Sequence, residues 1–227
     1  MSRTPRADEA GGLYHALNRG NLRTEIFHED ADYEAFEQIL AEALERFEVE
    51  LYCYQLLPSH WHLVLRPDQD NEMTRFVRWV TSTHTMRYQS RYNTSGSGHV
   101  YQGRFKSFPI QADSHFLKVC RYVEGNARRA KLVRRAEKWH WSSLWHWLQP
   151  TSSTLLSPWP IARSPKWVEK VNEPLAKPEL IALRNSVQRG CPFGEASWVE
   201  STVDRMGLES TVRPRGRPRV RFPDGKP

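Results

Sequence analysis

The stretch Leu57-Pro58-Ser59-His60-Trp61-His62-Leu63-Val64 joins two predicted strands through a two-residue connection. Residues 50–57 and 61–66 on either side are mainly apolar and aromatic, so the two segments are predicted to pair as an antiparallel hairpin. Residues two apart in a strand face the same side. His60 and His62 therefore present two imidazoles on one side of the hairpin.

Strand and helix patterns alternate on both sides of this hairpin. Residues 12–18 alternate as a strand, and residues 30–47 repeat apolar side chains every three or four positions, as one helix face requires. Further along, a helix is predicted at 71–91, an extended segment at 100–111 and a helix at 113–125. The order β-α-β-β-α-β-α predicts an α+β fold: a ferredoxin-like antiparallel sheet with helices on one face.

The amino-acid composition of the chain changes after Trp147. We expect a main domain at 10–147 and a linker at 148–178, because the latter is rich in Pro and Ser. Two short helices follow and predict a helical accessory module at 179–210, either a helical hairpin or a helix-turn-helix. A basic tail at 211–227 completes the chain.

Composition narrows the class of protein. With 39% hydrophobic and 26% charged residues, the chain suits a soluble folded protein rather than a disordered one. No run approaches the roughly 20 apolar residues that cross a bilayer, and the N-terminus lacks a signal-peptide core. The three cysteines, Cys53, Cys120 and Cys191, fit neither a disulfide framework nor a zinc site. We therefore expect a cytoplasmic protein without membrane partners.

Charge is concentrated at the C-terminus. The net charge is +7, and residues 211–227 contain six basic side chains against Asp224 alone. This suggests a polyanionic binding partner, and nucleic acid is the first candidate. A solvated tail without function is the alternative. Arg213-Pro214-Arg215-Gly216-Arg217-Pro218-Arg219 resembles an AT-hook, whose arginines enter the narrow minor groove of A·T-rich duplex DNA.

Two pairs of residues could carry chemistry. His60 and His62 can hold a divalent metal, although a His-x-His pair is more often a surface feature. Tyr122 and Asn126 lie four apart and share a helix face; a half-buried tyrosine hydrogen-bonded to the amide is the plainer interpretation. Together the four residues suit a mechanism in which the tyrosine attacks a DNA phosphate. Two imidazoles and an amide leave positions open on Mg²⁺ or Mn²⁺, which stabilises the developing charge.

Four motifs in register resemble the single-tyrosine HUH transposases, and most closely the REP-associated tyrosine transposases. The resemblance covers residues 10–147. Its motifs are Tyr14…Asn18-Arg19-Gly20-Asn21, the His60–His62 stretch, Tyr101-Gln102-Gly103-Arg104-Phe105 and Arg121-Tyr122-Val123-Glu124-Gly125-Asn126.

The resemblance implies an enzyme that cuts and joins single-stranded DNA beside hairpin repeats through a 5′-phosphotyrosine, without ATP. His60 and His62 match the metal-binding pair, Tyr122 the nucleophile and Asn126 the amide ligand. It further implies a protein associated with the nucleoid, as a monomer or a homodimer. Trp61, Gly125 and Ala127 depart from the usual pattern, but no departure removes a catalytic atom.

DNA-binding residues are expected in three places. By resemblance, the first strand and the segment after Tyr101 approach DNA through Asn18, Arg19, Gln102 and Arg104. Arg128 and Arg129 follow Asn126 closely and suit backbone contact, with a solvated helix face as the alternative. The tail contributes Arg213, Arg215, Arg217 and Arg219.

Two other functions compete with this hypothesis. One is a catalytically silent, sequence-specific DNA-binding protein that keeps the fold and the tail. The other is a metal-dependent phosphodiesterase that uses water instead of Tyr122. The intact His60, His62, Tyr122 and Asn126 argue against the silent DNA-binding protein. A covalent protein–DNA adduct separates the transposase from the phosphodiesterase.

Overall fold

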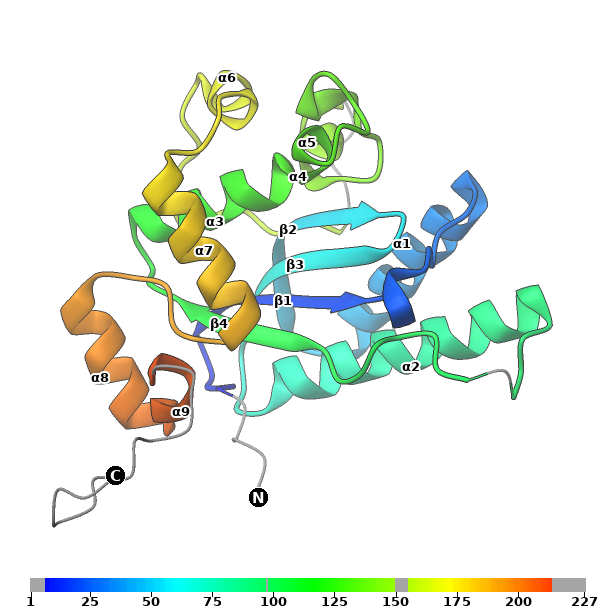
Figure 1. Cartoon of the computed structure of the whole chain (residues 1–227), viewed down its shortest axis with the longest axis horizontal. Helices are drawn as coiled ribbons and strands as arrows, with labels where there is room; N and C mark the ends of the chain where they lie inside the picture. Colours follow the sequence, from blue (N-terminus) through cyan, green and yellow to red (C-terminus); the bar gives the residue numbers. More distant parts are fainter. Residues whose placement is uncertain (1–6, 97, 150–154, 214–227) are drawn as a thin grey trace, which may run out of the picture.

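A four-stranded antiparallel sheet forms the centre of the molecule (Figure 1). The computed structural model describes residues 7–96, 98–149 and 155–213. The strands are β1 (Leu13–Arg19), β2 (Val49–Leu57), β3 (His60–Pro67) and β4 (Lys106–Ile110), and their order is β2-β3-β1-β4. The hairpin predicted from Pro58 and Ser59 is present, with Leu57 paired to His60.

The register of the sheet places the histidine pair beside the end of β1. Leu17 pairs with His62, and Arg19 pairs with His60. Beyond β1, residue Gln102 donates its backbone N–H to the Arg19 carbonyl at 2.9 Å. The segment before β4 is therefore attached to the same end of the sheet as the two histidines.

Helices cover both faces of the sheet. The helices α1 (Asp30–Arg46) and α2 (Glu72–Tyr92) pack on the face that carries Trp61. The third helix, α3 (Ser114–Glu124), packs on the opposite face against β2, β3 and β4. The predicted α+β, ferredoxin-like class is confirmed, but the expected coverage of one face only is corrected. The reason is in the strands themselves: Tyr52, Val64 and Phe108 make the second face apolar too.

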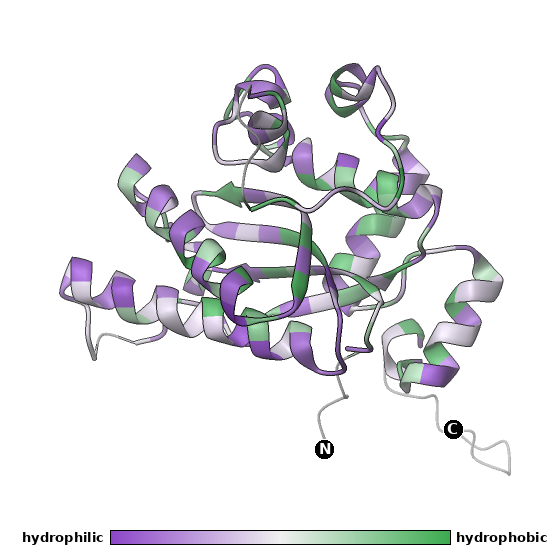
Figure 2. Ribbon diagram, turned by 180° about the vertical axis from the view of Figure 1, so that it is seen from behind, coloured by the Kyte–Doolittle hydropathy of each residue, from purple (hydrophilic) through white to green (hydrophobic). Residues whose placement is uncertain are grey.

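Local sequence explains where the main helices begin. Asp113 precedes α3 as predicted, and its side chain accepts the His115 backbone N–H at 2.7 Å. Helix α1 begins after Glu29, and Asp32 accepts the N–H groups of His28 and Glu29. Figure 2 shows hydrophobic residues on the strands and on α3, with a mixture of polar and apolar residues along α2.

The chain after α3 wraps the core with short helices. They are α4 (Asn126–Arg129), η2 (Ala136–Lys138), α5 (Ser143–Trp147), α6 (Trp167–Asn172), α7 (Lys177–Arg189), α8 (Ala196–Met206) and α9 (Glu209–Val212). A further short helix, η1 (Asn21–Arg23), follows β1. The segment expected to be a linker contains α6, whose Trp167 is buried against α3. Among the described residues, every helix is too short or too polar to cross a bilayer.

Helix α7 is docked on the sheet edge. The segment after it pairs with β4, because Phe193 donates to the Pro109 carbonyl at 2.9 Å and accepts from Gln111 at 3.0 Å. Gly190 ends the helix at a φ of +76°, and a Cβ there would lie 3.2 Å from the Ser107 carbonyl. Figure 1 shows α7 alongside α3 and β4.

Candidate active site

The two predicted histidines lie together on the face of β3 that α3 covers. The ring centroids of His60 and His62 are 5.1 Å apart. Trp61 points to the other face, is fully buried, and donates its indole N–H to the Tyr101 hydroxyl at 3.0 Å. The large residue between the histidines therefore serves the core and leaves their side of the strand free.

His62 has a partner on each ring nitrogen. Asn126 places its amide nitrogen 2.9 Å from Nε2, and His15 on β1 places its Nε2 2.9 Å from Nδ1. With the amide donating to Nε2, the His62 ring carries its proton on Nδ1 and donates it to His15. The sequence motifs include Asn126 but not His15, so His15 is a new member of the site.

The imidazoles of this cluster are held neutral. Burial lowers the pKa of His15 to about 3, and burial together with the positive charge of Arg19 lowers the pKa of His60 to about 4. Burial, aided by the other histidines, Arg129 and Arg19, holds the pKa of His62 well below its usual range. Neutral imidazoles are the form that binds metals.

Tyr122 on α3 faces the same place. Its ring is 6.2 Å from the His62 ring, edge to face, and its side chain is 8% exposed. The guanidinium of Arg129 stacks over the phenol ring at 4.2 Å and donates to the Tyr122 carbonyl at 2.5 Å. This contact turns Arg129 toward the tyrosine.

The helix that carries Tyr122 and Asn126 is interrupted between them. Helix α3 ends at Glu124, and α4 begins at Asn126 after Gly125. A Cβ on Gly125 would lie 3.0 Å from the Arg121 carbonyl and 3.1 Å from the Arg129 guanidinium. The helix is thus broken at this glycine, one of the departures from the usual pattern, although Tyr122 and Asn126 both still contact His62.

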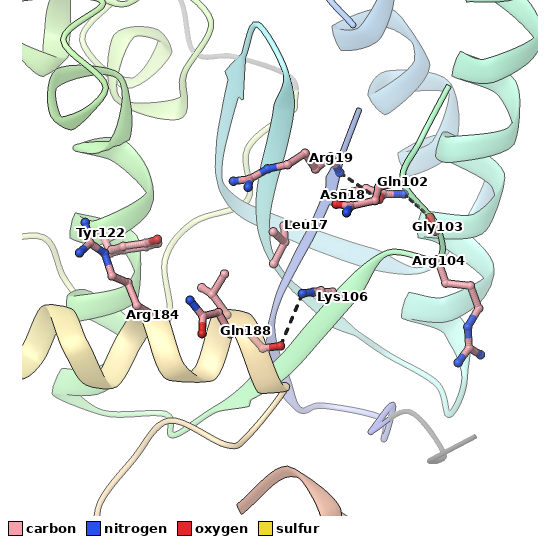
Figure 3. Close-up of a pocket in the computed structure, with 11 residues that line it drawn as sticks. Leu17, Asn18, Arg19, Gln102, Gly103, Arg104, Lys106, Tyr122, Arg184 and Gln188 are labelled. Carbon is pink, nitrogen blue, oxygen red and sulfur yellow. Dashed lines mark hydrogen bonds between the residues drawn. The ribbon is translucent and has the colours of Figure 1, made fainter. Parts of the chain in front are cut away.

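A cavity of about 410 Å³ opens beside Tyr122 (Figure 3). Four predicted DNA-binding residues line it: Asn18, Arg19, Gln102 and Arg104. The Asn18 amide donates to the Gly103 carbonyl at 3.3 Å, which fixes the two segments against each other. In Figure 3 Tyr122 projects into the cavity, whereas Arg104 points away toward its far end. None of the described lining residues is acidic.

Three further polar residues of the lining were not anticipated from the sequence. Lys106 comes from β4, and Arg184 and Gln188 come from α7. The Lys106 ammonium reaches the Gln188 carbonyl at 3.5 Å, which joins the two elements across the cavity. The cationic residues Arg19, Arg104, Lys106 and Arg184 form no ion pair within the described parts of the chain.

The other predicted residues lie elsewhere. Arg128 is half-buried on α4 and is not one of the residues that line the cavity. Arg213 follows α9, and its carbonyl accepts from the Arg189 side chain. Arg215, Arg217 and Arg219 lie outside the described residues.

His60, His62 and Asn126 could together hold a divalent cation, with the Asn126 amide as the third ligand. Within the described ranges, no three His, Cys, Asp or Glu side chains gather in a way that could hold a metal ion. His60 and His62 are neutral and face one side of β3, with the Asn126 amide in contact with His62. A cation held here would take the place of the hydrogen bond between Asn126 and Nε2 of His62; it would bind the two imidazoles and, with the Asn126 amide turned over, the amide oxygen, and would keep positions open for other ligands.

Comparison with known proteins bears on this arrangement. The sequence model of the family described as "Transposase IS200 like" matches residues 11–126. The structure of a REP-associated tyrosine transposase bound to a REP hairpin superposes with a TM-score of 0.55 at 18% identity, covering 70% of this chain and 98% of that one. That likeness shows the same fold.

A candidate transposase from Deinococcus radiodurans superposes less well. Its TM-score is 0.39 at 15% identity, over 54% of this chain and 96% of that chain. No curated protein matches the sequence.

Proposed function

Because the chain belongs to the IS200-like transposase family, we propose that it is a metal-dependent endonuclease and strand transferase for single-stranded DNA. The observation that carries the proposal is that Tyr122, which lines a cationic cavity, also lies against His62, whose ring is in turn in contact with Asn126. A phenol beside neutral imidazoles suits attack on a phosphodiester, and the cations around it suit the DNA backbone.

Tyr122 is the proposed nucleophile. Its hydroxyl oxygen forms a bond to the phosphorus and loses its proton to solvent, while the bond from phosphorus to the 3′ oxygen breaks. The released fragment takes up a proton and ends in a 3′-hydroxyl, and the other fragment stays on the protein, with its 5′ phosphate bonded to the tyrosine. Attack by another 3′-hydroxyl reverses the step, joins two DNA ends and restores the tyrosine.

Arg129 supports this step through its position over the phenol ring. Its guanidinium lies 4.2 Å from the ring centroid, so its charge favours the negative charge that develops on the phenol oxygen. Burial lowers the pKa of Arg129 to about 10, which still leaves the side chain charged at neutral pH.

His60, His62 and Asn126 are the proposed metal ligands. When Mg²⁺ or Mn²⁺ is bound, it supplies charge stabilisation and orientation for the phosphate. Ligation through the Nε2 atom of His62 requires the proton on Nδ1, and the Nε2 atom of His15 is the acceptor within reach. We therefore assign His15 the task of holding the His62 ring in the ligating tautomer.

The proposed substrate is single-stranded DNA next to a hairpin. It is supported by the REP hairpin bound to the structurally similar transposase. It is also supported by the neighbouring positions of Asn18, Arg19, Gln102 and Arg104 around the cavity. We propose A·T-rich duplex DNA as a second partner, on the basis of the sequence alone. It would bind through Arg213, Arg215, Arg217 and Arg219.

A cleavage assay tests the function. End-labelled hairpins with single-stranded flanks, taken from repeats that flank the gene, are incubated with the protein and Mg²⁺ or Mn²⁺. We expect cleavage that stops with EDTA and in the variant His62→Ala, while the variant still binds the DNA. Binding without cleavage under each metal would instead support the silent DNA-binding protein.

A further inference from the structure

The cavity beside Tyr122 does not end at α7 but continues past it. A second hollow of about 270 Å³ shares Arg104, Lys106 and Gln188 with the first, so the two adjoin and together form a groove, which the contact between the Lys106 ammonium and the Gln188 carbonyl crosses. Its remaining wall comes from the C-terminal part of the chain, including Arg189, Leu208 and Thr211. The groove thus runs from Tyr122, between β4 and α7, toward α9.

We propose that this groove is a track for single-stranded DNA, and that α7 is the wall that contacts the sugar-phosphate backbone through Arg184 and Gln188. This deepens the proposed function and rests on it. The match to the family's sequence model stops at residue 126, so α7 lies outside the matched region. The inference therefore concerns an element whose role the family assignment leaves open.

The placement of Arg184 is the first argument. Its exposed side chain lines the same cavity as Tyr122, and Figure 3 shows both projecting from neighbouring helices toward it. Leu183, next to it in sequence, is fully buried against the α3 side of the sheet. Burial of Leu183 fixes the rotation of α7 about its axis, so the position of Arg184 on the groove is set by the core.

The charge of the groove is the second argument. Arg19, Lys106 and Arg184 line it without an ion pair among the described residues, whereas Arg121, Arg163 and Arg205 elsewhere each pair with a glutamate. Cations left without carboxylate partners along one groove are the arrangement that binds a phosphate backbone.

The size and lining of the groove favour a single strand over a duplex. Hollows of a few hundred cubic ångströms accommodate groups of nucleotide size but not a double helix. Leu17 and Val187 add apolar contact, and the Tyr122 ring stands at one end. A cationic groove with apolar and aromatic surfaces is typical of sites that bind unpaired nucleotides.

Binding measurements on exposed residues of α7 test the proposal. The probes are a fluorescein-labelled single strand and a blunt hairpin, and binding is followed by anisotropy in EDTA so that no cleavage occurs. For Arg184→Gln we expect roughly fivefold to tenfold weaker binding of the single strand. The slope of log affinity against log salt concentration should fall by about 0.7, the value for one lost phosphate contact on a single strand.

A gain-of-function variant and a control complete the design. Gln188→Lys adds a cation to the groove and should bind the single strand about fivefold more tightly, with a steeper salt slope. Lys177→Gln removes a charge at the exposed start of α7, away from the groove-lining residues, and should bind as wild type does. The blunt hairpin should respond little to any of the three.

The outcomes separate this inference from the proposed function. If Arg184→Gln and Lys177→Gln bind the single strand equally well, α7 is not a wall of the track, while the cleavage chemistry is unaffected. If wild-type protein binds no single strand at all, the proposed function fails together with the inference.

Discussion

At the residue scale, the unusual feature is the chain of contacts that ends on His62. His15 on β1 pairs in register with Val64, which makes it the diagonal neighbour of His62 on the same face of the sheet. The two rings are in hydrogen-bond contact at 2.9 Å, and both are buried. A buried acceptor of this kind fixes the tautomer and the orientation of a ligating histidine.

This arrangement predicts a selective effect of substitutions at His15. His15→Met removes the acceptor with little change in volume and should weaken Mn²⁺ binding about 10- to 100-fold, measured by electron paramagnetic resonance of the free ion. His15→Gln keeps an acceptor at similar reach and should bind Mn²⁺ within a few fold of wild type. Equal Mn²⁺ affinity in both variants would show that His15 only fills space.

Local spacing explains which site residues the sequence revealed. His60 and His62 share a face because strands repeat every two residues, and Tyr122 and Asn126 lie one helical turn apart. His15 was missed because its partner lies 47 residues away, and only the strand register brings the two together.

At the element scale, the segment between the main domain and α7 is the largest departure from expectation. Its Pro and Ser content predicted a linker, yet Trp167 of α6 is buried and donates its indole N–H to Glu124 at 2.6 Å. Glu124 also accepts from the Ser143 hydroxyl at 2.7 Å, and burial raises the pKa of its carboxyl. A buried carboxyl of this kind needs its donors.

Helix α6 should therefore contribute to stability. Trp167→Phe keeps an aromatic ring at this position but removes the donor to Glu124 and part of the buried ring, and should lower the free energy of unfolding by about 1.5–3 kcal/mol in urea titrations. The matched control is Trp147→Phe, whose tryptophan is 44% exposed, and it should change the free energy by under about 0.5 kcal/mol. Equal effects would mean that α6 is only loosely attached.

The positions of the later helices could not be read from the sequence. Periodicity predicted helices near 179–189 and 195–206, and both are present as α7 and α8. Their docking depends on contacts such as the Phe193 pairing with Pro109, which joins residues 84 positions apart in the chain. The hydrophobic pattern alone therefore placed α7 in an accessory module, although this helix lines the groove beside Tyr122.

At the scale of the whole molecule, the start of the tail lies near the far end of the groove. Arg189 lines this end and donates to the carbonyl of Arg213, the last described residue. In the sequence, Arg215 and Arg217 follow shortly after Arg213.

The tail should bind duplex DNA with a preference for A·T-rich sequence. Replacing Arg215 and Arg217 together with alanine should weaken duplex binding, remove the preference and reduce the salt slope by about 1.8, the value for two phosphate contacts. The control replaces Arg221 and Lys226, which removes the same charge outside the Arg-Gly-Arg-Pro core and should preserve the A·T preference. Loss of the preference in both variants would show that the tail binds DNA only through its positive charge.

The central claim is that Tyr122 itself becomes bonded to DNA. The most direct measurement incubates the protein with a single-stranded hairpin substrate and Mn²⁺, digests it with trypsin, and locates the nucleotide adduct by mass spectrometry. We predict an adduct on the peptide that contains Tyr122, and none in Tyr122→Phe, whose folded structure should be unchanged by circular dichroism. DNA cleavage by Tyr122→Phe at the wild-type rate, with no adduct in either protein, would contradict the claim and identify water as the nucleophile.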